Sequence, residues 1–501
     1  MARSCLRLGT SKLGTHAAIA SLSLHGIPER AHSTSATIAA RRGNPLARCC
    51  SVGGCPLSFG QRLHEIRTGF EPAFWVANFT EIFERVAYYA TTAVLAIYLN
   101  DQLHFSNELA LSVTGTFGLV VWFLPILGGT LADRLGFRRA LMFAYLVMTV
   151  GYFLLGSLSA TWMEPLRHAL GDKWLVLAIL MIPALGPGMV KPCVAGTTAR
   201  ASKENVRSIG YSIYYTLVNI GGFIGPLVAF FVRQKLGWGI ENVFRVAACS
   251  VFLMFWVTLI FFREPSRVGN ERVASVREAI TNMVVVLANF RFLLFLGIIT
   301  LYYIVFWQVY MGLPLFVHNF VNHDAGVDAT LSVEAFTVIA CQVLIAILTR
   351  KIPTFRTIAI GIFLTSISWL ILTLPLPVGD VTLHLGFAAP TIYRITLYVA
   401  LTLFVLALGE VMLSSRYYDY ISRLAPSGQE GLYMGYAFLP IAIGYKAGGW
   451  LGGHLLHHFG EVEGKPQRMW FVVTAIGILA TLLMWVYDKI VKPQEATAGA
   501  A

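Results

Sequence analysis

The sequence has little charge for its length. Asp, Glu, Lys and Arg make up 13% of the 501 residues, whereas a soluble domain carries about 25%. Hydrophobic residues reach 56%, and the mean hydropathy is +0.66. This composition excludes an ordinary soluble domain and predicts an integral membrane protein, whose partner is the lipid bilayer.

Cysteine and the usual cofactor motifs are also scarce. The seven cysteines show neither a disulfide framework nor metal-ligand spacing: Cys5, Cys49, Cys50, Cys55, Cys193, Cys249 and Cys341. No Walker-type loop is present, so ATP drive is not supported. We therefore expect no metal centre, no organic cofactor and no enzyme activity.

The formal net charge is +12. In a soluble protein this would suggest a nucleic-acid partner. Here the cations lie between hydrophobic runs, where the positive-inside rule accounts for them, so we expect no nucleic-acid binding.

Hydropathy predicts twelve membrane-spanning helices, and therefore an all-α fold. They lie near residues 72–99, 108–133, 138–158, 174–199, 207–232, 244–263, 290–317, 331–350, 355–374, 391–413, 430–456 and 468–489.

Lys and Arg are distributed unequally between the connections. The even-numbered connections hold sixteen: Arg134, Arg138, Arg139, Arg200, Lys203, Arg207, Arg263, Arg267, Arg272, Arg277, Arg291, Arg350, Lys351, Arg356, Arg416 and Arg423. The odd-numbered connections hold eight: Arg167, Lys173, Arg233, Lys235, Arg245, Arg394, Lys465 and Arg468. This asymmetry predicts a multi-pass protein of the cell (inner) membrane with both termini in the cytoplasm; an organelle membrane is the alternative.

The chain divides into five segments. A six-helix bundle over 66–263 and another over 290–490 flank a charged cytoplasmic linker, 264–289, and a tail covers 491–501. Residues 1–65 are basic and Ser-rich with few acids. We expect them to be disordered or to reflect a misplaced start, with translation beginning nearer Val52; an organelle transit peptide is the other interpretation.

One stretch puts three charges inside the first span. Glu81, Glu84, Arg85 and Tyr88 fall at i, i+3, i+4 and i+7, so they share one face of a helix. Each charge costs roughly 2.5–3.5 kcal/mol at that depth on insertion scales. The stripe therefore faces protein or water, either as a structural ion pair or, the interpretation we favour, as a proton or ion relay along a transport path.

The connection between the second and third spans reads Gly129-Thr-Leu-Ala-Asp133-Arg134-Leu-Gly136-Phe-Arg138-Arg139. It resembles the signature loop of the major facilitator superfamily. The glycines allow close helix approach and a tight turn. Asp133 can cap or pair at the helix end, and the arginines anchor the cytoplasmic side.

Within that superfamily, Glu81-x-x-Glu84-Arg85-x-x-Tyr88-Tyr89 resembles the first-helix motif of the proton-dependent oligopeptide transporters. Further similarities are Gly188-Met-Val-Lys191-Pro192, Tyr211-x-x-x-Tyr215-x-x-x-Asn219-x-Gly221-Gly222, Gly409-Glu410, Leu424-Ala-Pro426 and Met434-Gly435. The resemblance spans about residues 70–490. It implies a twelve-helix major facilitator fold of two six-helix bundles.

The resemblance also implies roles for individual residues. Glu81, Glu84 and Arg85 would couple transport to protons. Lys191, which follows an expected helix break at Gly186-Pro187-Gly188, would form a gate-closing pair with Glu410 from the other bundle. Alternatively, both side chains snorkel to the interface. Substrate-binding candidates are Tyr88, Tyr89, Tyr215, Asn219, Trp307 and Lys446, although Tyr215 and Trp307 suit packed or lipid-facing positions equally well.

Two positions depart from the family. Peptide carriers usually have an arginine where this chain has Thr92, and an acid just after a Phe-Trp pair where this chain has Gln308-Val-Tyr310. These two groups pair in the family, so their joint loss is self-consistent, because a lone buried charge is costly. The loss puts one anchor for a peptide carboxylate in doubt.

The sequence thus predicts a monomeric carrier that imports small peptides or related solutes together with protons. Two alternatives stay open: a proton-coupled carrier of another anion or metabolite, and a non-transporting sensor on a carrier scaffold.

Overall fold

The computed structural model describes residues 68–265, 289–375, 379–382, 391–424 and 430–491. The segments expected at 1–65 and 491–501 lie outside these residues, apart from Val491, and so does most of the 264–289 linker. All the elements below belong to one compact unit, Leu63–Ala501.

The first half of the described chain is helical. Its helices are α2 (Pro72–Asp101), α3 (Asn107–Phe123), α4 (Pro125–Leu135), α5 (Phe137–Leu155), α6 (Glu164–Leu170), α7 (Asp172–Arg200), α8 (Arg207–Phe230) and α9 (Glu241–Phe261).

The second half adds nine helices and two short strands to the described residues. They are α11 (Phe290–Phe306), α12 (Gly312–Phe320), α13 (Val327–Thr330), α14 (Ser332–Leu348), α15 (Thr354–Ser368), β1 (Asp380–Thr382), β2 (Thr391–Tyr393), α16 (Arg394–Leu424), α17 (Glu430–Tyr436), α18 (Phe438–Leu455) and α19 (Met469–Val491). The strands pair antiparallel, with Val381 opposite Ile392, so the all-α expectation missed one small hairpin.

Eleven helices among the described residues are long and apolar enough to cross a membrane. They match eleven of the twelve predicted spans. The span predicted at 430–456 is instead divided into α17 and α18 at Ala437, and α18 is only 18 residues long. Glycine pairs at 448–449 and 452–453, together with Lys446, lower its hydropathy, but they let it pack closely on its neighbours.

Proline shapes two spans differently. Pro125 occupies the first turn of α4, so the span predicted at 108–133 is two helices that meet at Leu124. The break expected at Gly186-Pro187-Gly188 was wrong: α7 runs continuously through Pro183, Pro187 and Pro192. Neighbouring helices stabilise such prolines in membrane proteins. Gly186 and Gly188 lie against Met148 and Leu124, with no room for a side chain.

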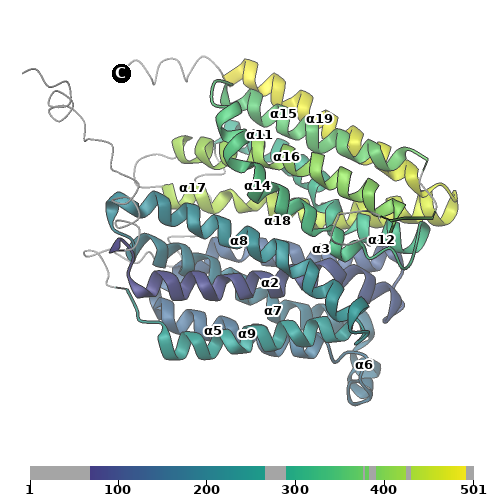
Figure 1. The fold of residues 1–501 in the computed structure, drawn as a ribbon, viewed down its shortest axis with the longest axis horizontal. Helices are drawn as coiled ribbons and strands as arrows, with labels where there is room; N and C mark the ends of the chain where they lie inside the picture. The colour runs from purple at the N-terminus through teal and green to yellow at the C-terminus, as the bar shows by residue number, and fades with distance from the viewer. Residues whose placement is uncertain (1–67, 266–288, 376–378, 383–390, 425–429, 492–501) are drawn as a thin grey trace, which may run out of the picture. The chain divides into compact units, whose positions relative to one another are not determined.

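Each half packs as its own bundle (Figure 1). In the first, α2 packs on α8 and α9, and α5 packs on α7 and α9. In the second, α15 packs between α16 and α19, while α11 packs on α18 and α19. The halves meet chiefly through α3 with α18 and through α8 with α14, and one buried hydrophobic core includes residues of both.

The α3–α18 contact runs along both helices. A Cβ on Gly449 would lie 2.4 Å from the carbonyl oxygen of Leu111, so the backbones nearly touch. Lys446 Nζ donates hydrogen bonds across this contact to Thr116 Oγ1 (2.7 Å), Ser112 Oγ (3.2 Å) and Ser112 O (3.1 Å). None of these three acceptors is a carboxylate. The ammonium group of Lys446 is therefore stabilised by hydrogen bonds to neutral oxygens.

The α8–α14 contact is one-sided. Gly222, Phe223, Arg233 and Gln234 on the α8 side lie against residues 326–336. Toward the other end of α8, Tyr211, Ser212 and Tyr215 are exposed. The polar contacts between α8 and α14 therefore lie near Arg233, whereas α8 exposes side chains toward the end that carries Arg134 and Arg207, here called the basic end.

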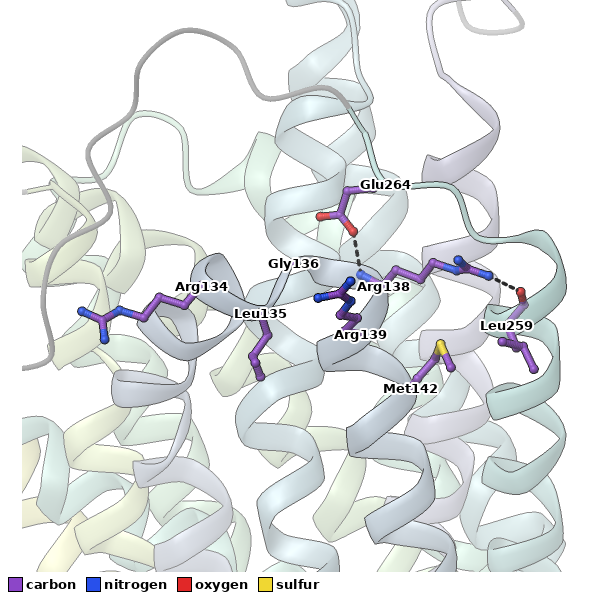
Figure 2. A pocket seen from close by; sticks show the side chains of 8 residues that line it. All are labelled: Arg134, Leu135, Gly136, Arg138, Arg139, Met142, Leu259 and Glu264. Atoms are coloured by element: carbon purple, nitrogen blue, oxygen red, sulfur yellow. Dashed lines mark hydrogen bonds between the residues drawn. The ribbon is translucent and has the colours of Figure 1, made fainter.

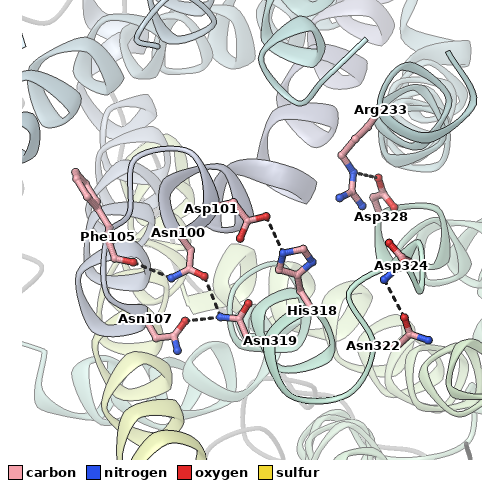
Figure 3. Close-up of polar contacts among 10 residues, drawn as sticks. All are labelled: Asn100, Asp101, Phe105, Asn107, Arg233, His318, Asn319, Asn322, Asp324 and Asp328. Atoms are coloured by element: carbon pink, nitrogen blue, oxygen red, sulfur yellow. Dashed lines mark hydrogen bonds and ion pairs between the residues drawn. The ribbon is translucent and has the colours of Figure 1, made fainter. Parts of the chain in front are cut away.

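A set of polar contacts, here called the polar latch, joins the halves at the closed end (Figure 3). Asn319 Nδ2 donates to Asn100 Oδ1 and to Asn107 Oδ1, both at 2.9 Å. His318 Nε2 lies 2.7 Å from Asp101 Oδ2, and Arg233 Nε lies 3.1 Å from Asp328 Oδ2. Asn107 also donates to Glu461 Oε1 at 2.6 Å. Several residues from both halves therefore hold this end shut.

Gly221 sets the distance between α8 and the charged stripe of α2. A Cβ at Gly221 would lie 2.3 Å from Arg85 Cβ. Gly221→Ala should therefore lower the free energy of unfolding by about 1–3 kcal/mol through overpacking. Thermal unfolding of the purified protein in detergent measures this. Gly297→Ala is the matched control, because a Cβ there meets nothing within 4 Å. Equal melting temperatures for Gly221→Ala and wild type would contradict the argument.

Candidate functional site

The charged stripe of α2 is fully buried. Glu81, Glu84 and Arg85 are each at most 1% exposed. The Arg85 guanidinium makes an ion pair and a hydrogen bond with Glu84, and its Nε lies 3.4 Å from Glu81 Oε1. The three charges share one helix face, as the spacing predicted, and one cation is shared by two carboxylates.

Glu81 is the less constrained of the two acids. Neither of its carboxylate oxygens accepts a hydrogen bond from the described residues, and Glu84 Oε1 is in the same position. A buried carboxylate with free acceptor positions can take up a proton without first breaking a hydrogen bond. These carboxylate oxygens therefore remain available as acceptors.

Lys191 of α7 lies beside this cluster. Its Nζ is 3.2 Å from the centroid of the Trp122 ring and 5.6 Å from that of Phe438. The charged groups that act on it are Arg85, Glu84 and Glu81. The expected contact between Lys191 and Glu410 is not formed here: the described residues show Lys191 on the aromatic rings, while Glu410 faces a different acid.

Glu410 of α16 pairs with a residue that sequence reasoning missed, Glu334 of α14. The two carboxyl groups lie within hydrogen-bonding reach of each other. Tyr310 OH donates to Glu334 Oε2 at 3.3 Å, and Glu334 is 6% exposed. Two facing carboxyl groups can share one proton, as in other carboxylate pairs.

Glu334 changes the charge balance within the spans. Glu81, Glu84 and Glu410 against Arg85, Lys191 and Lys446 are neutral in sum; Glu334 adds one negative charge. One proton on the Glu334–Glu410 pair restores neutrality. The available signal was an acid inside an apolar span, because Glu334 lies within the span predicted at 331–350, near its start.

Aromatic side chains connect the two groups of charges. Trp122 Nε1 donates to Tyr88 OH at 3.3 Å, and Trp307 packs on Trp122 and Tyr445, with ring centroids 5.7 and 4.4 Å apart. The ring centroids of Tyr89 and Tyr310 are 5.8 Å apart, and the Tyr310 hydroxyl donates to Glu334. Trp307 is thus packed in the protein rather than lipid-facing. This aromatic layer reaches from the Arg85 cluster to the Glu334–Glu410 pair.

The remaining predicted substrate residues differ in position. Tyr215 is 36% exposed, and its carbonyl oxygen accepts a hydrogen bond from Asn219 Nδ2 at 2.9 Å. Tyr215 also lies near Glu410 and Ser414 of α16. Lys446 instead contacts α3, as described above. The structure thus brings Tyr215 toward the acids and places Lys446 in an interface between helices.

The two departures from the family pattern are buried and neutral. Thr92 Oγ1 donates to Tyr89 O at 3.2 Å, and Gln308 Nε2 donates to Gly448 O at 2.9 Å. Both are at most 2% exposed. Gln308 therefore fastens the end of α11 to α18, and no buried charge is left at either position.

The loop predicted at 129–139 lies at the basic end (Figure 2). Glu264 accepts hydrogen bonds from the backbone N–H groups of Phe137 (2.7 Å) and Arg138 (2.8 Å), which caps α5. Arg138 also donates to Leu259 O at 2.6 Å. Gly136 adopts φ +83°, a conformation that favours glycine, so the sharp turn expected there is present. The side chain of Asp133 and the surroundings of Gly129 lie outside what the structure describes.

A pocket of about 510 Å³ is associated with this loop, and Arg134, Arg138, Arg139 and Glu264 contribute to its lining. It contains none of the residues of the Arg85 cluster. The loop therefore joins α4, α5 and the end of α9 at the basic end rather than forming part of the buried site.

Known proteins resemble this chain in sequence and in structure. The Major Facilitator Superfamily matches residues 77–397. A dipeptide and tripeptide permease B of Salmonella typhimurium is 23% identical over 438 residues, which cover 75% of this chain and 86% of the permease. The permease of the same name from Photorhabdus asymbiotica is 27% identical over 201 residues, 40% of this chain; the match spans only 38% of that protein.

Solved structures give the same fold. A crystal structure of a POT family transporter in complex with 5-aminolevulinic acid superimposes with a TM-score of 0.64 at 18% identity, over 83% of this chain and 96% of that one. With two bundles of membrane-length helices, the capped loop between α4 and α5, and a sequence match over most of its length, this chain belongs to the Major Facilitator Superfamily.

Proposed function

We propose that this chain is a proton-coupled symporter that imports small peptides or closely related solutes by alternating access. The observation that carries the proposal is the aromatic layer between two buried charge clusters of opposite halves. Glu81, Glu84 and Arg85 lie on one side, and Glu334 and Glu410 on the other. The similarity to the dipeptide and tripeptide permeases supports the same substrate class.

The chemistry suits a zwitterion with a short side chain. Lys191, held on Trp122, presents a cation to a substrate carboxylate. The Glu334–Glu410 pair presents anionic oxygens to a substrate ammonium group. When one carboxyl group of the pair holds a proton, the other stays anionic and can bind the ammonium, so substrate and proton are carried together, as symport requires. Because Thr92 and Gln308 replace the second pair of charges, a non-peptide amphipathic solute is the second candidate.

The arrangement of the two halves indicates to which side of the membrane the carrier is open. The polar latch closes one end, and Tyr211, Ser212 and Tyr215 are exposed toward the basic end. The distribution of Lys and Arg supports a cytoplasmic basic end. We therefore infer an inward-facing carrier in the cell (inner) membrane with both termini in the cytoplasm. It would act as a monomer and would use protons, without an organic cofactor.

Each proton that moves inward through a membrane potential of 100 mV supplies about 2.3 kcal/mol of free energy. Glu84→Gln should abolish dipeptide uptake driven by an inward proton gradient in proteoliposomes, because Arg85 then keeps only Glu81 and one titratable group is lost. Exchange of labelled for unlabelled dipeptide without a gradient should persist. The control is Glu71→Gln, an exposed position just before α2. Full gradient-driven uptake by Glu84→Gln would overturn the assigned role.

If a folded wild-type protein takes up no dipeptide, the substrate class is wrong. The same assay with non-peptide amino acids and organic anions then decides between the second candidate and a sensor that binds a solute without transporting it.

Glu334→Gln should reduce gradient-driven uptake at least tenfold, because the amide cannot share a proton with Glu410. Initial uptake rates at several external pH values measure this effect. Glu164→Gln, at an exposed position on α6, is the matched control. An unchanged pH profile in Glu334→Gln would leave Glu334 as a packing residue and Glu410 to act alone.

Alternating access requires the polar latch to open. In a background with the native cysteines replaced, Asn100→Cys with Asn319→Cys should be joined by a short thiol-reactive cross-linker, because these amides are in direct contact. Cross-linking should stop uptake, and a reducing agent should restore it for a reducible linker. Each single cysteine variant treated in the same way is the control. Uptake at the normal rate by cross-linked protein would refute opening at this end.

A further inference from the structure

Three potential metal ligands come together in and beside the polar latch. Ligand atoms of Asp101, His318 and His323 all lie within 4.8 Å of one another. His318 Nε2 already contacts Asp101 Oδ2 at 2.7 Å, and the rings of His318 and His323 are 4.0 Å apart between centroids. Figure 3 shows Asp101 and His318 pointing toward each other from different helices.

The local fold brings these side chains close together. His318 is in the last turn of α12, and the backbone N–H groups of Val321 and Asn322 both donate to Val317 O, which ends the helix. Asn322 Oδ1 then accepts from the N–H of Asp324 at 2.8 Å. These bonds shape the turn that returns His323 to His318. Asp101 is the last residue of α2, next to Asn100, which Asn319 binds.

The ligand set is selective. Two imidazole nitrogens and a carboxylate oxygen suit a borderline divalent ion such as Zn²⁺, whereas Mg²⁺ and Ca²⁺ prefer oxygen ligands alone. Zn²⁺ binds such atoms at about 2.0–2.2 Å, usually with four ligands. A shift of the exposed His323 toward the buried His318 would complete three of the four, and water can supply the fourth.

We propose that Asp101, His318 and His323 form a binding site for a divalent transition-metal ion, with Zn²⁺ as its best-suited occupant. The ion replaces the hydrogen bond between His318 and Asp101, and the proton of that bond goes to solvent. One ligand comes from the first half and two come from the second. The ion therefore ties the halves together at the closed end.

A functional consequence follows, and it rests on the proposed function. In a carrier that must open this end to load substrate, bound Zn²⁺ stabilises the closed latch and slows transport. The site is thus an inhibitory metal site, here called the brake, at which bound Zn²⁺ slows transport. Its ligands are distinct from the proton-coupling and substrate residues.

Isothermal titration of the purified full-length protein tests the site directly, in metal-free buffer at about pH 7.5 and with any affinity tag removed. Wild type should bind one Zn²⁺ saturably and should not bind Mg²⁺ in the same range. His323→Ala and Asp101→Asn should each weaken Zn²⁺ binding at least tenfold. Since His323 is exposed, its replacement should leave folding intact.

The matched control replaces His454 and His457 with Ala. Both are exposed histidines close to acids, Glu108 and Glu461 respectively, and so resemble an adventitious surface site. This variant should keep the wild-type affinity. Absence of saturable binding, or equal affinities for wild type and His323→Ala, would overturn the site.

Uptake in proteoliposomes tests the brake separately. External Zn²⁺ should reduce wild-type uptake, a chelator should restore it, and His323→Ala should be at least tenfold less sensitive. If no substrate is transported, the proposed function fails while the titration still decides the metal site. If uptake is robust and Zn²⁺ binds at the site without slowing it, the brake alone is refuted.

Discussion

The burial of Arg85 is the constraint on which the rest of the first half depends. A cation removed from water is tolerated only with close counter-charges, because desolvation costs several kcal/mol per ion. Glu84 and Glu81 supply them from the same helix. Gly221 lets α8 pack directly against this point, and Lys191 remains nearby because Trp122 stabilises it through its ring. Helix packing and charge placement are therefore parts of one arrangement.

The charged groups that the second half contributes opposite this cluster are two acids. Glu334 and Glu410 face each other beside Tyr310, and the aromatic layer of Trp122, Trp307 and Tyr89 lies between the two groups. The proposed binding of a zwitterion uses Lys191 on one side of this layer and the Glu334–Glu410 pair on the other. It also explains why Thr92 and Gln308 can be neutral: the chain retains other charges for both ends of a substrate.

The two interfaces between the halves have different chemistry. Along α3 and α18, glycines and the hydrogen bonds of Lys446 give a continuous contact. Between α8 and α14, the polar contacts include the ion pair of Arg233 and Asp328 near the C-terminal end of α8. A continuous interface can act as the axis, and a one-sided interface can open and close. Polar contacts suit the second task, because water can hydrogen-bond to the same groups when the contact opens.

The sequence by itself determined the membrane setting, eleven of the spans within a few residues, the charged face of α2 and the superfamily loop, because hydropathy and helical periodicity are local properties. It did not reveal that α17 and α18 are separate, that α7 is continuous through its prolines, or that a hairpin precedes α16. Only the tertiary structure shows that Glu334 faces Glu410, that Lys191 lies over the Trp122 ring, and that Asp101, His318 and His323 lie close together. These residues are distant in sequence, and which of them meet depends on how the two bundles pack, which no local pattern records.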